Sequence, residues 1–330
     1  MTNAIWLWAL LGMSGCQQDA DYGAIDAAIK SDLEDQRAEG AELLLKLAAR
    51  GAAFGELNRR LVYCISSEDY YLQTYSMEIL KLRIADARND PATFAPRLVS
   101  MLQYPDSRSK QAFDVLLLFE RGAASSLAKC LRHPSSRFHE SQMIKLAAKL
   151  GESASIAAEP LEELAKSKRE EFEKVAVASA LISVSPRNKF ANDFLTLVCK
   201  TNGTGLSIAA AEALLKSSAN AEVGARRLAR TLDDDATSNV VALEIVLKVW
   251  ESRAVIPEDV FPILSKICRD DSRSPELAIA AASCALRARS GDRSFREAIH
   301  RHEVTARQFA NGTVTQKEMN KWLVNNGLIR

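Results

Sequence analysis

The segment from His133 to Gly151 constrains the fold of this chain more than any other segment does. Pro134 and Ser135 mark a turn, and the residues after them place apolar side chains three and four apart, which is the helical period. Gly151 is typical of the residue that ends a helix. A shorter helix is predicted upstream, over residues 123–132. The segment therefore predicts a hairpin of two helices, and hairpins of about thirty residues recur along the chain.

Two independent series of turn signals support this repeat. Turns inside the hairpins are predicted at intervals of 29 to 37 residues, at Ser66–Asp69, Pro105–Asp106, Pro134–Ser135, Lys168–Arg169, Asn202–Gly203, Asp233–Asp235 and Asp270–Asp271. Breaks between hairpins are predicted at intervals of 29 to 39 residues, near Gly51, Ala87, Gly122, Gly151, Pro186, Ser218, Ser252 and Gly291. Because one hairpin cannot bury its apolar face alone, neighbouring hairpins are expected to stack.

Composition and local signals agree with an all-helical array. Hydrophobic residues make up 47% of the chain and charged residues 26%, which excludes wholesale disorder. Asp90-Pro91 and Ser274-Pro275 each offer a capping side chain followed by proline at the first helical position, and Pro257 can open another helix. Second helices such as 206–215 and 277–286 are rich in alanine, which lets helices approach closely. The expected fold is an all-α solenoid of about seven to eight hairpins.

The turn and second-helix pattern resembles that of HEAT-like (armadillo-type) repeats. The residues that carry the resemblance are Pro105-Asp106-Ser107-Arg108 with Ala112, Pro134-Ser135-Ser136-Arg137 with Ala147, and Asp270-Asp271-Ser272-Arg273 with Ala280. The units at 168–186 and 233–252 lack the proline and the arginine. The resemblance covers roughly residues 22–291 and implies a solenoid that serves as a binding scaffold.

Three functions are compatible with this resemblance. The expected one is a non-enzymatic scaffold that binds a protein partner, with no cofactor, as a monomer. The alternative is an enzyme, because the HEAT-like group includes bilin lyases and alkylpurine DNA glycosylases. A glycosylase would need a basic groove and stacking aromatics, whereas the net charge is +1 and the second helices carry mainly alanine, leucine and serine. No nucleic-acid partner is therefore expected. The third function is a cytosolic scaffold.

Tyrosines supply the candidate binding residues. Four of the six tyrosines lie between Tyr63 and Tyr75, and Tyr71 and Tyr75 share one face of a predicted helix. Tyrosine is enriched at the energetic centres of protein interfaces. Tyr71 and Tyr75 are therefore the candidate partner-binding residues, with packing between repeats as the other interpretation.

The remaining reactive side chains predict no catalytic or metal site. Cys64, Cys130, Cys199 and Cys268 recur at intervals of two repeats, which is too far for disulfides and typical of core positions. Cys284 lies on a different helix, and no CxxC occurs. The histidines are His133, His139, His300 and His302, and no pair has zinc-ligand spacing. The arginine strings at 226–230 and 287–289 are expected to be solvated faces.

The residues beyond the array, 292–330, are expected to form a helical cap. Thr315 and Glu318 fit a capping box, and Met319, Trp322 and Leu323 come next at helical spacing. Such a helix would cover the apolar face that the last repeat leaves open.

The first residues resemble the signal of a bacterial lipoprotein. An apolar run of nine residues, Ile5–Met13, is too short to span a bilayer and precedes Ser14-Gly15-Cys16, which matches a lipobox. Met13 replaces the usual leucine, and no basic residue precedes the run. The resemblance implies a signal peptide over 1–15, a lipid on Cys16, a tether over 16–21 and a membrane-anchored location on the periplasmic side. Gln17 favours the outer membrane, and a cytoplasmic location is the alternative.

Replacing Cys16 with Ser is expected to prevent lipid attachment and to leave an uncleaved precursor, because the modified atom is the cysteine sulfur. Two or three acyl chains anchor a protein stably, since each buried methylene contributes about 0.8 kcal/mol. Membrane fractionation and intact-mass measurement of both forms test this. Wild-type chain in the soluble fraction with Met1 intact and no lipid would contradict it.

Overall fold

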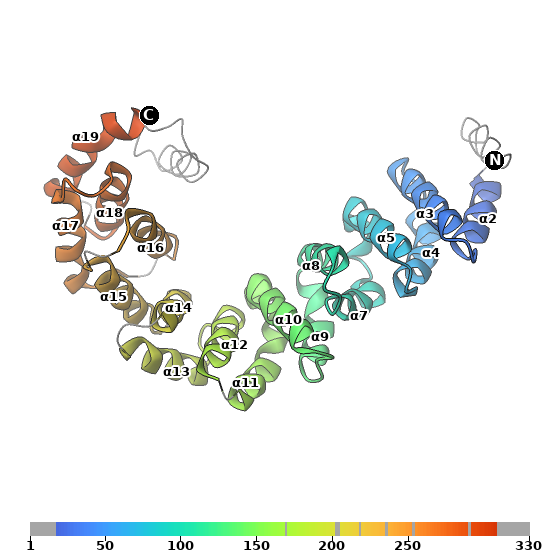
Figure 1. Cartoon of the computed structure of the whole chain (residues 1–330), viewed down its shortest axis with the longest axis horizontal. Helices are drawn as coiled ribbons and strands as arrows, with labels where there is room; N and C mark the ends of the chain where they lie inside the picture. The colour runs from blue at the N-terminus through green and yellow to red at the C-terminus, as the bar shows by residue number, and fades with distance from the viewer. Residues whose placement is uncertain are drawn as a thin grey trace. The chain divides into compact units, whose positions relative to one another are not determined.

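The computed structural model of this chain describes residues 18–168, 170–201, 205–217, 219–234, 237–252, 255–289 and 292–308. Every regular element in these ranges is helical (Figure 1), which confirms the all-α prediction. No helix in the described ranges is both long enough and apolar enough to cross a membrane. The predicted signal peptide, Cys16 and the helix bearing Met319, Trp322 and Leu323 lie outside the described residues. These features stay predictions.

The chain divides into two compact units, Met1–Leu164 and Ala165–Arg330. Unit 1 holds α2 (Gln18–Ile29), α3 (Glu34–Ala49), α4 (Phe54–Ser66), α5 (Tyr70–Leu82), α6 (Ile84–Ala87), α7 (Pro91–Met101), α8 (Ser107–Phe119), α9 (Arg121–Leu131), α10 (Arg137–Leu150) and η3 (Gly151–Ala157). The unit boundary falls within α11 (Ala158–Ser167). Unit 2 holds α12 (Glu171–Val184), α13 (Lys189–Lys200), α14 (Gly205–Leu214), α15 (Ala221–Leu232), α16 (Asn239–Glu251), η4 (Glu258–Val260), α17 (Phe261–Arg269), α18 (Pro275–Ala288) and α19 (Arg293–Gln308).

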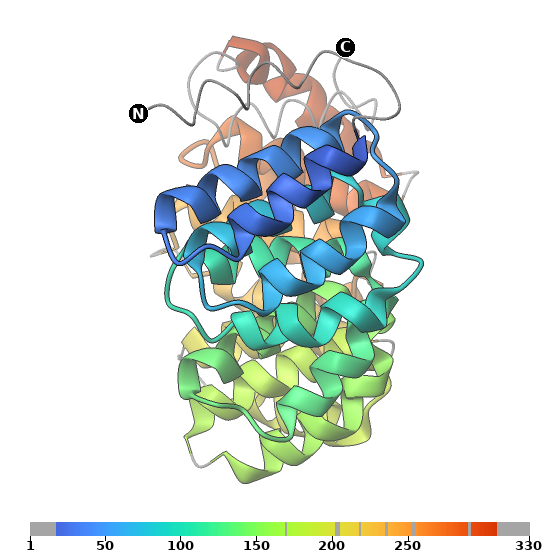
Figure 2. The same ribbon diagram turned by 90° about the vertical axis from the view of Figure 1, so that its right-hand side faces the viewer.

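Each unit has two layers of helices. In unit 1 the first helices of successive hairpins, α4, α7 and α9, contact one another, and the second helices, α3, α5, α8 and α10, do the same. Figure 2 turns unit 1 toward the viewer and shows its helices stacked side by side. In unit 2, α13 contacts α15 and α15 contacts α17, while α12 contacts α14 and α16 contacts α18. This arrangement is the one expected of stacked helical hairpins.

The alanine-rich second helices are buried, as their composition predicts. In α18 every residue from Leu277 to Ala285 is buried. The helix is enclosed by α16, α17 and α19, and small side chains let these helices come close. Phe295, Ala298 and Ile299 of α19 are buried in this contact. α19 therefore covers α18 within the region predicted as a cap, whose full extent to residue 330 stays a prediction.

Capping side chains explain where the second helices begin. Asp69, Asp106, Ser136, Ser238 and Ser274 each accept a hydrogen bond from a backbone N–H in the first turn of the next helix. Such a bond satisfies a donor that has no partner inside the helix and typically contributes about 1 kcal/mol.

Proline opens two of the three helices for which the sequence predicts it. Pro91 is the first residue of α7 and Pro275 is the first residue of α18, as predicted. Pro257 instead precedes the short helix η4, and α17 begins only at Phe261.

Four of the predicted breaks lie at a glycine, and glycine ends the helix at two of the three that the structure describes; Gly291 lies outside the described residues. Gly51 and Gly151 have φ of 84° and 57°, in the left-handed region that favours glycine. The break predicted near Gly122 falls between α8 and α9, but the residue with positive φ there is Glu120 (50°), and Gly122 itself lies inside α9. A Cβ at Gly122 would lie 2.7 Å from Cβ of Pro91. Gly122 is therefore required by the close approach of α9 to the start of α7.

Gly122→Ala is expected to destabilise the protein by about 1–3 kcal/mol, because the proline ring opposite cannot move aside as a flexible side chain would. Gly55→Ala is the matched control: Gly55 also lies in a helix, and nothing lies within 4 Å of its Cβ position. The control is expected to stabilise by about 0.4–1 kcal/mol. Urea-unfolding midpoints measure both, and equal shifts for the two variants would contradict the role assigned to Gly122.

Candidate functional site

The two tyrosines predicted to bind a partner lie on α5, in the layer of second helices of unit 1. Tyr71 is 39% exposed and Tyr75 is partly exposed. The residues on the opposite side of α5, including Leu72, Ser76 and Leu80, are buried. Tyr71 and Tyr75 therefore share the outward face of the helix, as their spacing predicts.

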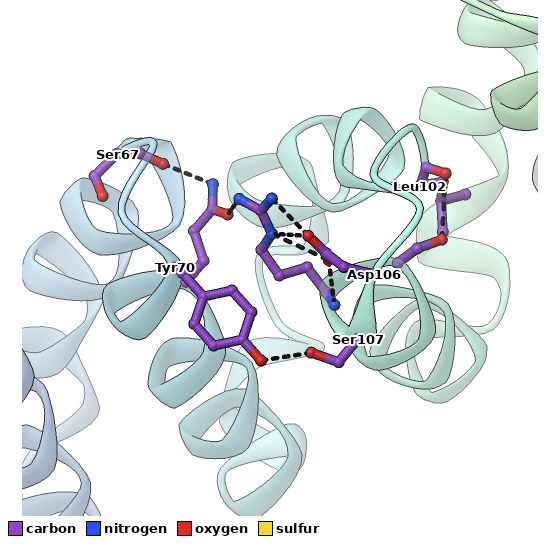
Figure 3. A network of polar contacts seen from close by, with 8 residues as sticks. Ser67, Tyr70, Leu102, Asp106 and Ser107 are labelled. Atoms are coloured by element: carbon purple, nitrogen blue, oxygen red, sulfur yellow. Dashed lines mark hydrogen bonds and ion pairs between the residues drawn. The ribbon is translucent and has the colours of Figure 1, made fainter.

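Tyr70 belongs to the same cluster, although the sequence did not single it out. Its side chain is 43% exposed, and its ring meets the ring of Tyr71 edge to face, with centroids 5.6 Å apart. The Tyr70 hydroxyl forms a hydrogen bond of 2.7 Å with Oγ of Ser107, the first residue of α8 (Figure 3). Tyr70 therefore joins the second hairpin to the third and fixes the position of its neighbour Tyr71.

Arg108 of α8 stabilises this junction. Its guanidinium carbon lies 3.8 Å from the ring centroid of Tyr104 and 5.7 Å from that of Tyr70. The same group donates to both carboxylate oxygens of Asp106 at 2.7–3.1 Å and to Oε1 of Gln73 at 3.1 Å (Figure 3). Cation–π contacts of this kind contribute about 0.5–2 kcal/mol. The guanidinium thus has aromatic and polar partners on both hairpins.

The ionisation of Asp106 reflects this arrangement. The hydrogen bond from the Arg108 side chain is the largest influence and holds the pKa of the Asp106 carboxyl below its ordinary value, against a smaller effect of burial. Asp106 also accepts from the backbone N–H of Arg108 at 2.8 Å, so one carboxylate caps α8 and holds the arginine. The ion pair with Arg108 requires the ionised form.

A similar ion pair joins the first hairpin to the second. Nε of Arg37, on α3, donates to Asp69, the cap of α5, at 2.7 Å. Burial alone would raise the pKa of Asp69, but hydrogen bonds from the Leu72 backbone N–H and from Arg37 outweigh it and leave the pKa below its ordinary value. The tyrosine cluster therefore lies on hairpins that polar contacts link on both sides.

The seam between α5 and α8 also contains incompletely satisfied polar atoms. Oγ1 of Thr74 and Oε1 of Gln111 are buried and have no hydrogen-bond partner among the described residues. Thr74 lies between Tyr71 and Tyr75 in sequence, and Gln111 lies on the adjacent helix. A buried polar atom without a partner costs about 1–3 kcal/mol, so this seam is not packed for stability alone.

The cysteines occupy core positions, as predicted, with one exception. Cys64, Cys199, Cys268 and Cys284 are buried, whereas Cys130 is only partly buried, and all five are free thiols. Burial raises the pKa of Cys64 and Cys268 to about 12 and that of Cys199 and Cys284 to about 11. Thiols with such pKa values are poor nucleophiles. The described residues contain no group of three or more side chains that could hold a metal ion.

The prediction that the arginine strings are solvated faces needs revision. Arg226 pairs with Asp259 at 3.0 Å, and Arg287 donates to the backbone carbonyl of Trp250. Both contacts link neighbouring hairpins of unit 2. Among the histidines, His139 is buried, and its Nε2 lies 2.9 Å from the carbonyl of Val99, which links α10 to α7. The side chains of His300 and His302 lie outside the described residues.

Comparison with known proteins finds similarity in structure. No family model matches the chain, and no curated protein matches it. A solved structure of the complex of CpcE and CpcF of phycocyanin lyase from Nostoc sp. PCC7120 matches at 16% sequence identity with a TM-score of 0.34. The match covers 73% of this chain and 91% of that chain. The match extends to the helical-repeat fold alone.

This match corrects the prediction that the chain is not an enzyme. The prediction rests on the rule that helical repeats mostly serve as binding scaffolds, and the solved chain belongs to a lyase, so that rule is not sufficient here. The helical-repeat fold therefore does not support the prediction of a non-enzyme, and that prediction is withdrawn. No residue of this chain takes a catalytic role from the match.

Asp106→Asn is expected to destabilise unit 1 modestly, by less than about 1 kcal/mol, because asparagine still caps α8 but no longer pairs with Arg108. The carboxylate's contribution is fully present above the ordinary aspartate pKa of 3.8 and is lost as pH falls through the lower pKa of the folded state. The stability difference between wild type and variant should therefore shrink in acid. Unfolding midpoints between neutral pH and pH values below 3.8 measure it, and a difference that does not change with pH would contradict the ion-pair explanation.

Proposed function

We propose that this protein binds another protein through the layer of second helices of unit 1, with Tyr71 at the centre of the contact. The observation that carries the proposal is a pair of adjacent tyrosines, Tyr70 and Tyr71, that are 43% and 39% exposed. A hydrogen bond to the next hairpin holds Tyr70 in place, and the ring of Tyr71 meets the ring of Tyr70 edge to face. An exposed aromatic side chain that is already ordered loses little entropy when a partner covers it.

The chemistry of the tyrosine side chain supports a protein as the partner. Tyrosine combines an apolar ring with a hydroxyl group. A polypeptide offers apolar side chains together with backbone donors and acceptors, so it complements both kinds of group.

Replacing Tyr71 and Tyr75 together with Ala is expected to abolish partner binding, because aromatic residues at an interface centre commonly contribute 2 kcal/mol or more, roughly thirtyfold in affinity. The test is affinity capture from native cells followed by quantitative mass spectrometry. Phe172→Ala in unit 2 is the matched control, since Phe172 is an aromatic residue with 58% exposure. The control should retain every partner, and retention by the Tyr71/Tyr75 variant would refute the proposed site.

The alternative function is an enzymatic reaction on a bound protein. Bilin lyases, which belong to the HEAT-like group that the sequence resembles, carry out a reaction of this kind. The solved neighbour is a phycocyanin lyase, which agrees with this alternative. Both functions begin with protein binding, and only the lyase then transfers a pigment to the bound protein. Pigment that stays with an acceptor protein on a denaturing gel, after incubation with a bilin and this chain, would favour the lyase. Partner capture without pigment transfer would favour binding alone.

A further inference from the structure

On the second helices of unit 1, the exposed charged residues are acidic at one end of the unit and basic at the other. On α3 every exposed charged residue is acidic: Glu34, Asp35, Glu39 and Glu42. On α10 every exposed charged residue is basic: Arg137, Lys145 and Lys149. Between them, Glu78 is the exposed charged residue of α5 and Lys110 is that of α8. Since the contacts run α3 to α5 to α8 to α10, the layer changes from acid at one end to base at the other.

The spacing of these residues places them on the outward face that carries the tyrosines. Asp35, Glu39 and Glu42 are separated by four and three residues on α3, and Tyr71, Tyr75 and Glu78 repeat the same spacing on α5. On α10, Phe138, Lys145 and Lys149 are separated by seven and four. We refer to this outward surface of α3, α5, α8 and α10 as the graded face.

Most of the exposed charges at the two ends of the graded face have no ion-pair partner among the described residues; the exception is Glu42, which pairs with Lys46 of the same helix at 2.7 Å. No ion pair with another described residue involves Asp35, Glu39, Lys145 or Lys149, whereas charged residues at the seams, such as Arg37 and Asp69, are paired. The ends of the graded face are thus free to pair with another molecule.

We propose that the graded face binds the graded face of a second copy of this chain, about a two-fold axis that passes between α5 and α8. A two-fold interface requires a surface that is complementary to itself, so that residue i meets residue j and j meets i. A half-turn reverses the gradient and brings the acids of α3 opposite the bases of α10, and Glu78 opposite Lys110. A second copy of the chain therefore already carries the charge pattern that is complementary to the graded face. Any other partner would need the same pattern.

The composition of the graded face fits such an interface. Tyr71 and Tyr75 on α5 and the exposed Leu118 on α8 lie on the two helices that flank the axis. Protein interfaces usually have aromatic and apolar residues at their centre and charged residues at their rim. The net charge of +1 leaves no overall repulsion between two copies. The inference rests on the proposed function, in which this layer of helices is a protein interface. A dimer differs from the monomer that the sequence analysis expects.

Two charge-reversed variants of the full chain test the proposal. One variant, Asp35→Lys with Glu39→Lys, makes both ends of the graded face basic, and the other, Lys145→Glu with Lys149→Glu, makes both ends acidic. Wild type is expected to form a dimer in sedimentation equilibrium, and its association should weaken as salt is added. Each variant alone should associate at least roughly tenfold more weakly, because like charges then face each other. An equimolar mixture of the two should form a heterodimer, which also shows that both variants are folded.

The control makes the same change of charge outside the graded face. Arg59 on α4 and Lys129 on α9 are exposed on first helices, and their replacement by Glu should leave the wild-type dimer unchanged. A dimer that both graded-face variants retain would overturn the proposal, since the copies would then meet elsewhere. A wild-type chain that stays monomeric at every concentration would also overturn it. If partner capture still depended on Tyr71 in that case, the proposed function would stand and the face would bind a different protein.

Discussion

The contact between the apolar faces of successive hairpins is the interaction on which the rest of this structure depends. The clearest example is α18, which is buried along its central nine residues because α16, α17 and α19 enclose it. Burying one aliphatic side chain contributes about 1.5–3 kcal/mol, so each seam between hairpins contributes far more than any single polar contact. No hairpin keeps this contribution without its neighbour, and the stability of each unit is a sum over adjacent pairs.

Polar contacts across the same seams fix how the hairpins align. Arg37 with Asp69, Tyr70 with Ser107 and Lys248 with Glu212 each join residues 32 to 37 positions apart, which is one repeat. Apolar packing tolerates small sliding, whereas hydrogen bonds of 2.7 Å require one relative position. One of these bonds orders Tyr70 of the candidate site, so the same hydroxyl group serves the alignment of the hairpins and the position of the tyrosine cluster.

Much of the fold was predictable because it arises from local chemistry. Capping residues such as Asp69 and Ser274 and the glycine stop at Gly151 act within a few residues, and they begin or end helices where the sequence indicates. Features that depend on contact between distant residues were missed. Gly122 is a glycine because Pro91 lies against it, and the division at Leu164 does not interrupt the repeat period. At the site, Tyr71 and Tyr75 were evident from spacing, but the role of Tyr70 depends on Ser107 in the next hairpin.

The full enclosure of α18 has a consequence for how this protein can change in evolution. A helix with no free side admits almost no substitution, because any larger side chain would displace a neighbour. On α3, α5 and α10, by contrast, the exposed positions at intervals of three, four and seven residues lie opposite the buried ones. Mutations there can reverse a charge or replace a ring and leave the packing intact. The same chain can therefore acquire a new binding preference by drift on a few outward positions, while its interior stays as it is.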